Sequence, residues 1–228
     1  MKKIILLALV TFLLTTTVFA GMIVVEETYN GALISYDVSI PMEKGWNLVL
    51  GAGALLEAAP LGFSAGSEVK FGNLKAMYVY NPSTREYVRI LPGVDREKIA
   101  TFVSTGDLLS IPYWLYSDKA GTLQFRSRGI PAVHYRQLYS GWNLVGISPE
   151  MEGRTFQELF SGCTVEKSFI YNNKVYTGHT EPSWERVYED SKFEDNAMGY
   201  GMAVKVTGQC TMAAAPALGG TPPALPGN

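Results

Sequence analysis

Histidine and cysteine, which most often carry catalysis or bind transition metals, are scarce in this chain. Its 228 residues include 2 of each, and His134 and His179 lie far apart at unrelated positions. A multi-histidine metal site is therefore excluded. The sequence also lacks His-Glu-x-x-His, Gly-x-Ser-x-Gly, a phosphate-binding glycine loop and a paired Cys-x-x-Cys. No active site is recognisable, so we expect no enzymatic activity, no cofactor and no metal.

Positive charge is in short supply too. Lysine and arginine total 19 against 21 acidic residues, which gives a formal net charge of −2 with no basic stripe. Such a surface argues against binding to nucleic acid or to anionic membranes. One acidic cluster could supply oxygen ligands for calcium but lacks EF-hand spacing, so we interpret it as a solvated loop. Its members are Glu185, Glu189, Asp190, Glu194 and Asp195.

Long hydrophobic runs are absent except at the start of the chain. Lys2 and Lys3 precede an apolar run, and Val18-Phe19-Ala20 fits a signal peptidase site. We therefore predict a secretory signal at residues 1–20, cleaved after Ala20. An uncleaved anchor is the alternative, but the run is short against the ~20 apolar residues of a membrane span. The expected location is secreted, at the cell surface or in the periplasm, without membrane insertion after cleavage.

The two cysteines, Cys163 and Cys210, lie late in the chain. In an oxidising compartment such a pair forms a disulfide, with a Cα separation of ~4.4–6.8 Å. The alternative is a Cys163 nucleophile served by His179, although the residues around Cys163 match no nucleophile signature. The disulfide is the prediction that export favours.

What the sequence does contain is an internal repeat. The segment Gly45-Trp46-Asn47-Leu48-Val49 recurs as Gly141-Trp142-Asn143-Leu144-Val145, and a shared tryptophan makes coincidence a poor explanation. Two further matches follow in the same order, with spacing that shrinks along the chain: Tyr78–Asn81 with Phe169–Asn172, and Tyr113–Gly121 with Tyr200–Gly208. Loop trimming in a second copy explains the shrinking spacing.

Most of each copy has the alternation and the turn residues of strands. The expected strands are Lys75–Asn81, Glu86–Leu91, Asp107–Tyr116 and Thr122–Arg126, then Val165–Asn172, Trp184–Tyr188, Gly201–Thr207 and Gln209–Met212. Helix is expected only as short turns, at Thr155–Phe160 and Asp95–Lys98. The predicted fold is all-β: two tandem, related repeats resembling a β-sandwich or barrel.

This pattern divides the chain into four parts. They are a signal peptide at 1–20, a first repeat with an N-terminal hairpin at 21–128, a second repeat at 129–212 and a flexible Ala/Pro/Gly tail at 213–228. The new N-terminus begins with a strand-forming run, Met22–Glu26, before a turn at Tyr29-Asn30-Gly31. That run either pairs with the strand Ala32–Ile40 of its own chain or adds to the edge of a neighbouring molecule.

The repeated motif is interpreted as structural. Glycine permits a turn or bulge, and tryptophan and leucine two residues apart fall on one face of a strand. We therefore expect Trp46 and Trp142 to point inward as core anchors, since a buried indole removes a large apolar area from water. The structural residues of the motif are Gly45, Trp46, Asn47, Gly141, Trp142 and Asn143.

The motif, together with a strand ending in Tyr-Asn and a closing Gly-Tyr-Gly-Met-Ala-Val-Lys-Val, resembles small all-β repeats of secreted and cell-surface prokaryotic proteins. In those repeats the motif reads GWNLISLP or GWNLVGYP. The match is good from Gly141 to Met212, whereas Val49–Gly53 replaces the usual proline-containing turn in the first copy. The resemblance implies a structural or adhesive part of a cell envelope, and it transfers no catalytic residue.

The resulting hypothesis is a non-catalytic structural or adhesive protein that acts through contacts with itself or with other envelope proteins. A carbohydrate-binding module that takes cell-wall glycan is the alternative, with Tyr176, Trp184 and Tyr188 as candidates to stack on sugar rings. A secreted hydrolase that uses paired carboxylates is the least favoured class. A flat strip of exposed aromatic rings would favour sugar binding, and a long unpaired edge strand would favour assembly.

Overall fold

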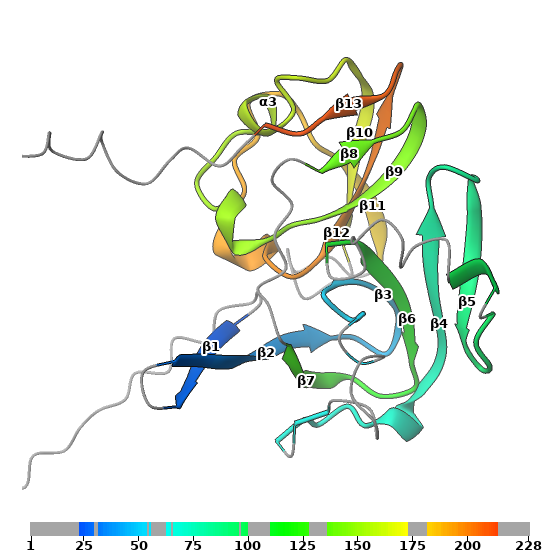
Figure 1. Cartoon of the computed structure of the whole chain (residues 1–228), viewed down its shortest axis with the longest axis vertical. Helices are drawn as coiled ribbons and strands as arrows, with labels where there is room; N and C mark the ends of the chain where they lie inside the picture. Colours follow the sequence, from blue (N-terminus) through cyan, green and yellow to red (C-terminus); the bar gives the residue numbers. More distant parts are fainter. Residues whose placement is uncertain are drawn as a thin grey trace, which may run out of the picture.

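The computed structural model describes nine segments of the chain: residues 23–29, 32–53, 55, 63–64, 66–95, 97–99, 110–127, 136–172 and 182–213. The predicted signal peptide, Tyr176 and all but the first residue of the tail lie outside them. Within them the molecule is built mainly from antiparallel strands with a few short helical turns (Figure 1). The all-β class is confirmed. No helix in this part of the chain has the length and apolarity needed to cross a membrane.

The first four-stranded sheet contains the first copy of the repeated motif. Its strands lie in the order β3 (Gly45–Leu50), β6 (Pro112–Ser117), β4 (Leu74–Asn81) and β5 (Glu86–Leu91). Alternation sets the two faces, since Met77 and Val79 are buried while Tyr78 and Tyr80 on the opposite face are half-buried.

The second four-stranded sheet repeats this arrangement. It runs β9 (Gly141–Gly146), β12 (Gly201–Val206), β10 (Val165–Asn172) and β11 (Ser183–Arg186). The strands with matching sequences occupy the same places in the two sheets: β3 corresponds to β9, β6 to β12, β4 to β10 and β5 to β11. The predicted strands between 75 and 91 and between 165 and 212 are confirmed to within a few residues at their ends.

Two smaller sheets and several short helical turns complete the part of the fold that the structure describes. One sheet joins β1 (Ile23–Tyr29), β2 (Ala32–Met42) and β7 (Gly121–Ser127), and the other joins β8 (Gln137–Leu138) to β13 (Cys210–Thr211). Pairing of β1 with β2 within one chain is the first of the two arrangements expected for the N-terminal run. The helical turns are η1 (Phe71–Asn73), η2 (Pro149–Met151), α3 (Phe156–Leu159) and η3 (Asp195–Ala197).

The strand ladders of the two large sheets correspond residue by residue. Trp46 lies opposite Tyr116, and Trp142 lies opposite Lys205. Both sheets also have an irregularity at the same point, between Leu74 and Ala76 in one and between Val165 and Lys167 in the other. The ladders correct one part of the sequence alignment. Tyr113 lies opposite Val49, and Met202 lies opposite Val145, the residue equivalent to Val49. Tyr113 therefore corresponds to Met202, and its predicted match with Tyr200 is wrong by two residues.

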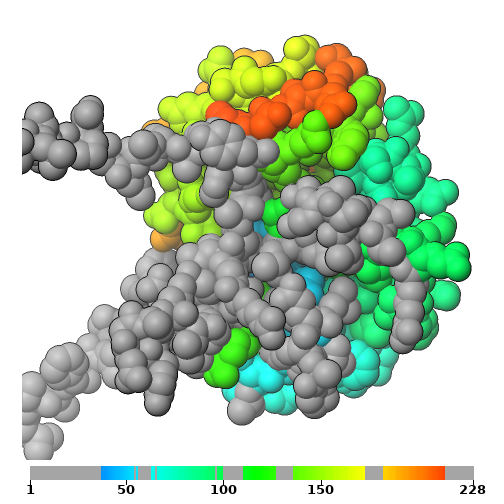
Figure 2. Space-filling model, viewed as in Figure 1, coloured from blue at the N-terminus to red at the C-terminus, as the bar shows by residue number. Residues whose placement is uncertain are grey.

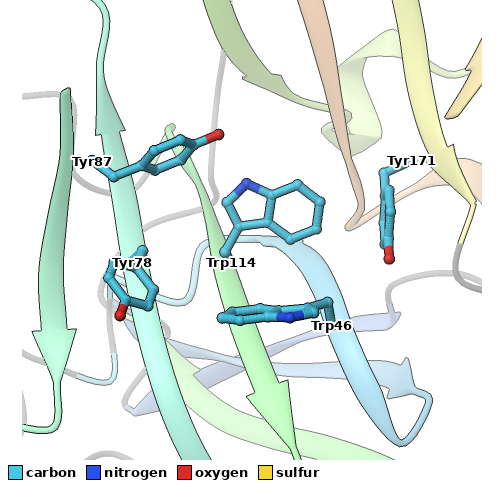
Figure 3. A pocket seen from close by; sticks show the side chains of 5 residues that line it. All are labelled: Trp46, Tyr78, Tyr87, Trp114 and Tyr171. Carbon is cyan, nitrogen blue, oxygen red and sulfur yellow. The ribbon is translucent and has the colours of Figure 1, made fainter. Parts of the chain in front are cut away.

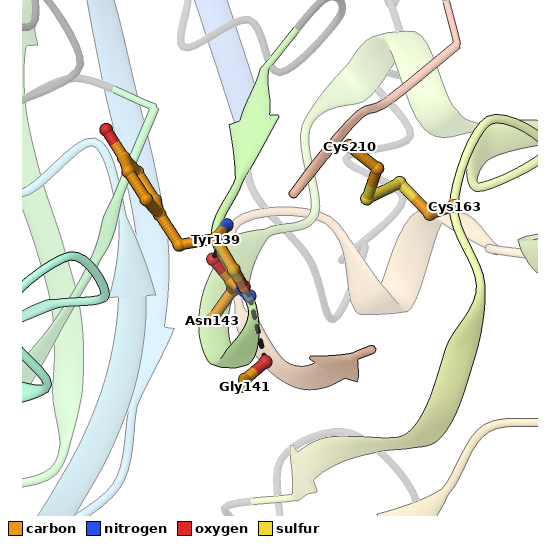
Figure 4. The surroundings of a disulfide bond; sticks show 5 residues. All are labelled: Tyr139, Gly141, Asn143, Cys163 and Cys210. Carbon is orange, nitrogen blue, oxygen red and sulfur yellow. Dashed lines mark hydrogen bonds between the residues drawn. A yellow bond between two sulfur atoms is a disulfide. The ribbon is translucent and has the colours of Figure 1, made fainter. Parts of the chain in front are cut away.

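The repeated motif builds the same turn in both sheets. Gly45 and Gly141 have φ values of 108° and 96°, a region that residues with a Cβ rarely adopt. Asn143 is fully buried, accepts from the Tyr139 amide at 2.9 Å and donates to the carbonyls of Tyr139 at 2.7 Å and Gly141 at 3.1 Å (Figure 4). Asn47 makes the equivalent three bonds, at 2.9, 2.8 and 3.1 Å. The asparagine is therefore what closes the turn.

The two sheets share one hydrophobic core. A single buried cluster contains residues of both halves, from Val38 to Met212. The sheets approach most closely where a leucine of β3 meets a glycine: a Cβ on Gly146 would lie 2.2 Å from Leu50 Cδ1, and one on Gly201 would lie 2.5 Å from Leu48 Cγ. A bridge between Val49 and Tyr200 continues this seam. The halves are therefore joined through a common core, and on the right of Figure 2 atoms of the second half lie directly against those of the first.

The predicted disulfide between Cys163 and Cys210 is confirmed, with a Cα separation of 5.3 Å (Figure 4). It joins the loop after α3 to β13. The Thr155 hydroxyl and the Glu158 carboxylate form a capping box at the start of α3, which explains why this segment is helical.

We predict that Asn47→Ala and Asn143→Ala each lower the free energy of unfolding by about 2–3 kcal/mol. Each removes three hydrogen bonds and leaves buried backbone groups without a partner. Urea unfolding followed by circular dichroism measures the loss, with the exposed Gln137→Ala as control. Losses that differ by more than about twofold between the two sites would contradict the equivalence of the turns.

The Cys163→Ser, Cys210→Ser double variant tests the disulfide. The bond closes a loop of 47 residues, which the chain-entropy model values at about 4 kcal/mol. Addition of reductant to the unmodified protein should produce the same shift of the denaturation midpoint as the double variant. A midpoint that neither change alters would show that the bond does not stabilise the fold.

Candidate binding site: an aromatic cleft

The outward faces of the two large sheets carry an unusual concentration of aromatic side chains. These are the residues that alternate with the buried ones along each strand. All 4 tryptophans of the chain belong to this set. Its members are Trp46, Tyr78, Tyr80, Tyr87, Trp114, Tyr116, Trp142, Phe169, Tyr171 and Trp184. We call this surface the aromatic cleft.

The prediction that Trp46 and Trp142 are core anchors is wrong. Each side chain is 39% exposed, whereas Leu48 and Leu144, two residues further along the same faces, are buried. The cause is the position of the seam between the sheets. Leu48 packs on Gly201 from the opposite sheet, but that sheet does not extend over Trp46. The indoles of Trp46 and Trp142 therefore lie beyond the contact between the two sheets and remain exposed.

The first subsite of the cleft is a cavity of about 380 Å³. It is lined by four residues of the first sheet, Trp46, Tyr78, Tyr87 and Trp114, and by Tyr171 of the second (Figure 3). Trp114 is the bridge, because its ring lies 4.6 Å from Tyr171 and 5.9 Å from Trp184 between centroids. The rings cross at steep angles, 87° for Trp46 with Trp114 and 78° for Trp114 with Tyr171. The rings pack edge to face and together line one cavity, so they do not form the flat strip expected for sugar stacking.

The second subsite is a neighbouring cavity of about 490 Å³. Its lining residues are Tyr80, Tyr87, Trp142, Leu144, Phe169, Trp184 and Ala203. Tyr87 therefore borders both subsites, so the two lie side by side. Here most of the lining comes from the second sheet, and the first sheet contributes the two tyrosines.

The two subsites are built from equivalent positions of the two sheets. The strand pairing identifies which lining residues are equivalent. With the residue of the first subsite given first, the pairs are Trp46 and Trp142, Tyr78 and Phe169, Tyr87 and Trp184, Trp114 and Ala203, and Tyr171 and Tyr80. Tyr171 of the second sheet lines the subsite formed mainly by the first sheet, and the equivalent Tyr80 of the first sheet lines the subsite formed mainly by the second. This reciprocal exchange is characteristic of an approximate two-fold relation. Trp114 and Ala203 break the symmetry, and the subsite with alanine is the larger one.

The chemistry of the cleft is apolar with hydrogen-bond donors. None of the described residues that line either subsite is charged. Indole N–H groups only donate, and burial raises the pKa of Tyr171 and of Tyr80 above the ordinary 10.0, with Tyr87 adding to the effect at Tyr80. Their hydroxyls therefore stay protonated at neutral pH. Arg89 and Arg186 stand at equivalent positions beside Tyr78 and Phe169, which makes the surroundings unfavourable for a cationic ligand.

The structure places Trp184 and Tyr188, two of the three residues expected to bind sugar, in different cavities. Trp184 is 43% exposed and lines the second subsite. Tyr188 lines a different, more polar cavity with Arg186, whose guanidinium carbon lies 5.3 Å from the centre of the tyrosine ring. Tyr176 lies outside the described residues. The sequence analysis missed Trp114, Tyr78, Tyr87 and Tyr171, although period-two alternation places their rings on one face.

Other kinds of chemistry find little support in the described part of the chain. No three His, Cys, Asp or Glu side chains gather there as metal ligands would. Glu185 of the acidic cluster accepts a hydrogen bond from the buried Asn172. Asp195 raises the pKa of Glu152 by sharing a hydrogen bond and by charge repulsion. Both cysteines are consumed by the disulfide, so the alternative of a Cys163 nucleophile is excluded in this oxidised form.

Comparison with protein families, curated proteins and solved structures finds no match. The candidate site is therefore argued from its own geometry.

The raised pKa values of Tyr80 and Tyr171 predict a stability loss in alkali. A phenol whose pKa is higher in the folded state holds its proton longer there, so stability is unaffected below pH 10 and falls as pH rises through the folded pKa. The Tyr80→Phe, Tyr171→Phe double variant should lose less stability between pH 9 and pH 12, as measured by thermal melting. Tyr188→Phe, outside the cleft, serves as control, and equal slopes in all three proteins would contradict the prediction.

Proposed function

We propose that this chain is an exported, non-catalytic adhesive protein that binds an extended, proline-rich peptide in its aromatic cleft. Two related tandem units, at 21–128 and 129–212, would each supply one sheet and one subsite. The observation that carries the proposal is the pair of adjacent, uncharged aromatic subsites with equivalent linings. Contiguous exposed aromatic surface of this kind marks binding sites more often than it occurs by chance.

The shape of the cleft favours a polyproline II helix. Such helices dock in grooves lined by aromatic rings, and they lose little conformational entropy because proline has already fixed the backbone. A cavity walled by edge-to-face rings such as Trp46 and Trp114 offers aromatic surfaces against which a projecting pyrrolidine ring can pack. Two neighbouring subsites match prolines that recur every three residues, one turn of the helix.

The hydrogen-bonding character of the cleft points the same way. Proline has a carbonyl acceptor but no N–H donor, and the cleft offers the donors of four indoles and several phenols. A sugar hydroxyl needs an acceptor as well as a donor when it leaves water, and the phenol oxygens are the side-chain acceptors that the lining offers. No carboxylate or amide side chain is found among the described residues that line the subsites. The glycan alternative is therefore less well matched.

Export and adhesion are supported more generally. The N-terminal segment has the layout of a cleavable signal, and a disulfide belongs in an oxidising compartment.

Titration of the exported protein with a ten-residue oligoproline tests the proposal, with intrinsic tryptophan fluorescence as the readout. Trp114→Ala should weaken binding about 30-fold, the effect of losing a central aromatic hot spot. The variant should fold, because the equivalent position already holds Ala203. Phe71→Ala, which removes an exposed ring outside the cleft, is the matched control.

A cell-wall oligosaccharide provides the second arm of this experiment. Binding of oligoproline that depends on Trp114, with no response to the glycan, supports the proposal. Binding of the glycan alone, weakened by Trp114→Ala, would replace the peptide with a sugar as the ligand. No response to oligoproline overturns the proposal.

A further inference from the structure

We infer that the aromatic cleft binds the proline-rich tail of a second copy of this chain, at Pro222–Pro226, so that copies join head to tail. The inference rests on the proposed function, because it requires the cleft to accept a proline-rich peptide. It adds the identity of the partner and makes the adhesive protein self-assembling.

The tail has the composition that the cleft selects. Residues 213–228 contain no charged side chain, and 4 of the 12 prolines of the chain fall between Pro216 and Pro226. They include the segment Pro222-Pro223-Ala224-Leu225-Pro226. Its lack of positive charge matters, because Arg89 and Arg186 flank the cleft and no acidic side chain is among the described residues that line it.

The spacing of the prolines also fits the two subsites. In a polyproline II helix, Pro223 and Pro226 lie on the same side, one turn or about 9 Å apart. The two subsites share Tyr87 and are therefore adjacent, which leaves one proline for each.

The place where the tail begins indicates that a second copy supplies it. Ala213 donates to the Leu159 carbonyl at 2.9 Å, and Met212 donates to the Arg136 carbonyl at 2.9 Å. Leu159 belongs to α3, which lies on the side of the second sheet away from the first sheet (Figure 1). Ile170 and Val204 are buried in the core. Phe169 and Ala203, their neighbours along β10 and β12, face the cleft. Ala213 is therefore anchored on the far side of the second sheet from the cleft, and the eight residues between it and Pro222 would have to pass around that sheet to reach the cleft of their own copy.

Such a contact is heterologous: the tail of one copy meets the cleft of the next, and each copy retains one free tail and one free cleft. Interfaces of this kind extend into open chains unless a rotation closes them into a ring. Strand addition by β1 is not needed for assembly, because β1 pairs with β2 of its own chain.

Sedimentation velocity of the exported protein over a range of concentrations tests the inference. Two full-length variants are compared with the unmodified protein, a tail variant with Pro223→Ala and Pro226→Ala and a cleft variant with Trp114→Ala. Each should lower the self-association constant about 30-fold. Pro216→Ala, outside the five-residue segment, and Phe71→Ala, outside the cleft, should leave it unchanged.

A mixture of the two variants gives the decisive result. The tail variant keeps an intact cleft and the cleft variant keeps an intact tail, so an equimolar mixture should form a heterodimer that neither forms alone. Self-association that persists in both variants would overturn the inference. So would an unmodified protein that stays monomeric at all concentrations, as capture of the tail by its own cleft would produce.

Peptide binding to the tail variant separates the two proposals. A synthetic peptide of residues 213–228 and a ten-residue oligoproline are titrated in parallel. Binding of both supports both proposals. Binding of oligoproline alone leaves the proposed function standing and overturns the inference about the tail. If neither binds, both are overturned.

Discussion

The close contact between two leucines of β3 and two glycines of the second sheet is the constraint on which the rest of the molecule depends. Leu48 and Leu50 fit only because Gly201 and Gly146 have no side chain, since a Cβ at either position would overlap them. Apolar burial then joins two sheets that each have a core face of their own into one body. The position of this contact also determines how far the two sheets cover each other. Just beyond it the outward aromatic rings remain open, so the seam that stabilises the fold also creates the cleft.

Much of the fold was predictable because it depends on local patterns. Alternation located most strands, the apolar residues of Thr155–Phe160 indicated the helical turn at α3, and scarcity of cysteine left one possible pairing. The order in which strands join each sheet was not predictable, because it depends on contacts between distant segments. The alignment of Tyr113 with Tyr200 failed for a related reason. A shift of two residues keeps every side chain on the same face, so the sequence alone cannot detect it.

The cleft was harder to predict than the fold. Period-two alternation assigns Trp46 and Leu48 to one face but does not say whether that face is covered along its whole length. Tryptophan is usually buried, and here the general rule led to the wrong choice. A better signal was the composition of both faces. Strands such as β4 and β6 carry apolar residues on one face and Trp or Tyr on the other, which is more aromatic surface than a solvent-facing side normally exposes.

The disulfide has a mechanical consequence. It fastens the chain at Cys210, three residues before Ala213, to the loop that leads into β10. A pulling force on the tail would otherwise peel away β13, which is held to β8 by a ladder of only two residue pairs. With the bond closed, tension passes through covalent linkage into the middle of the second sheet. A chain of such molecules would bear load in the oxidised state and yield at the base of each tail once reduced.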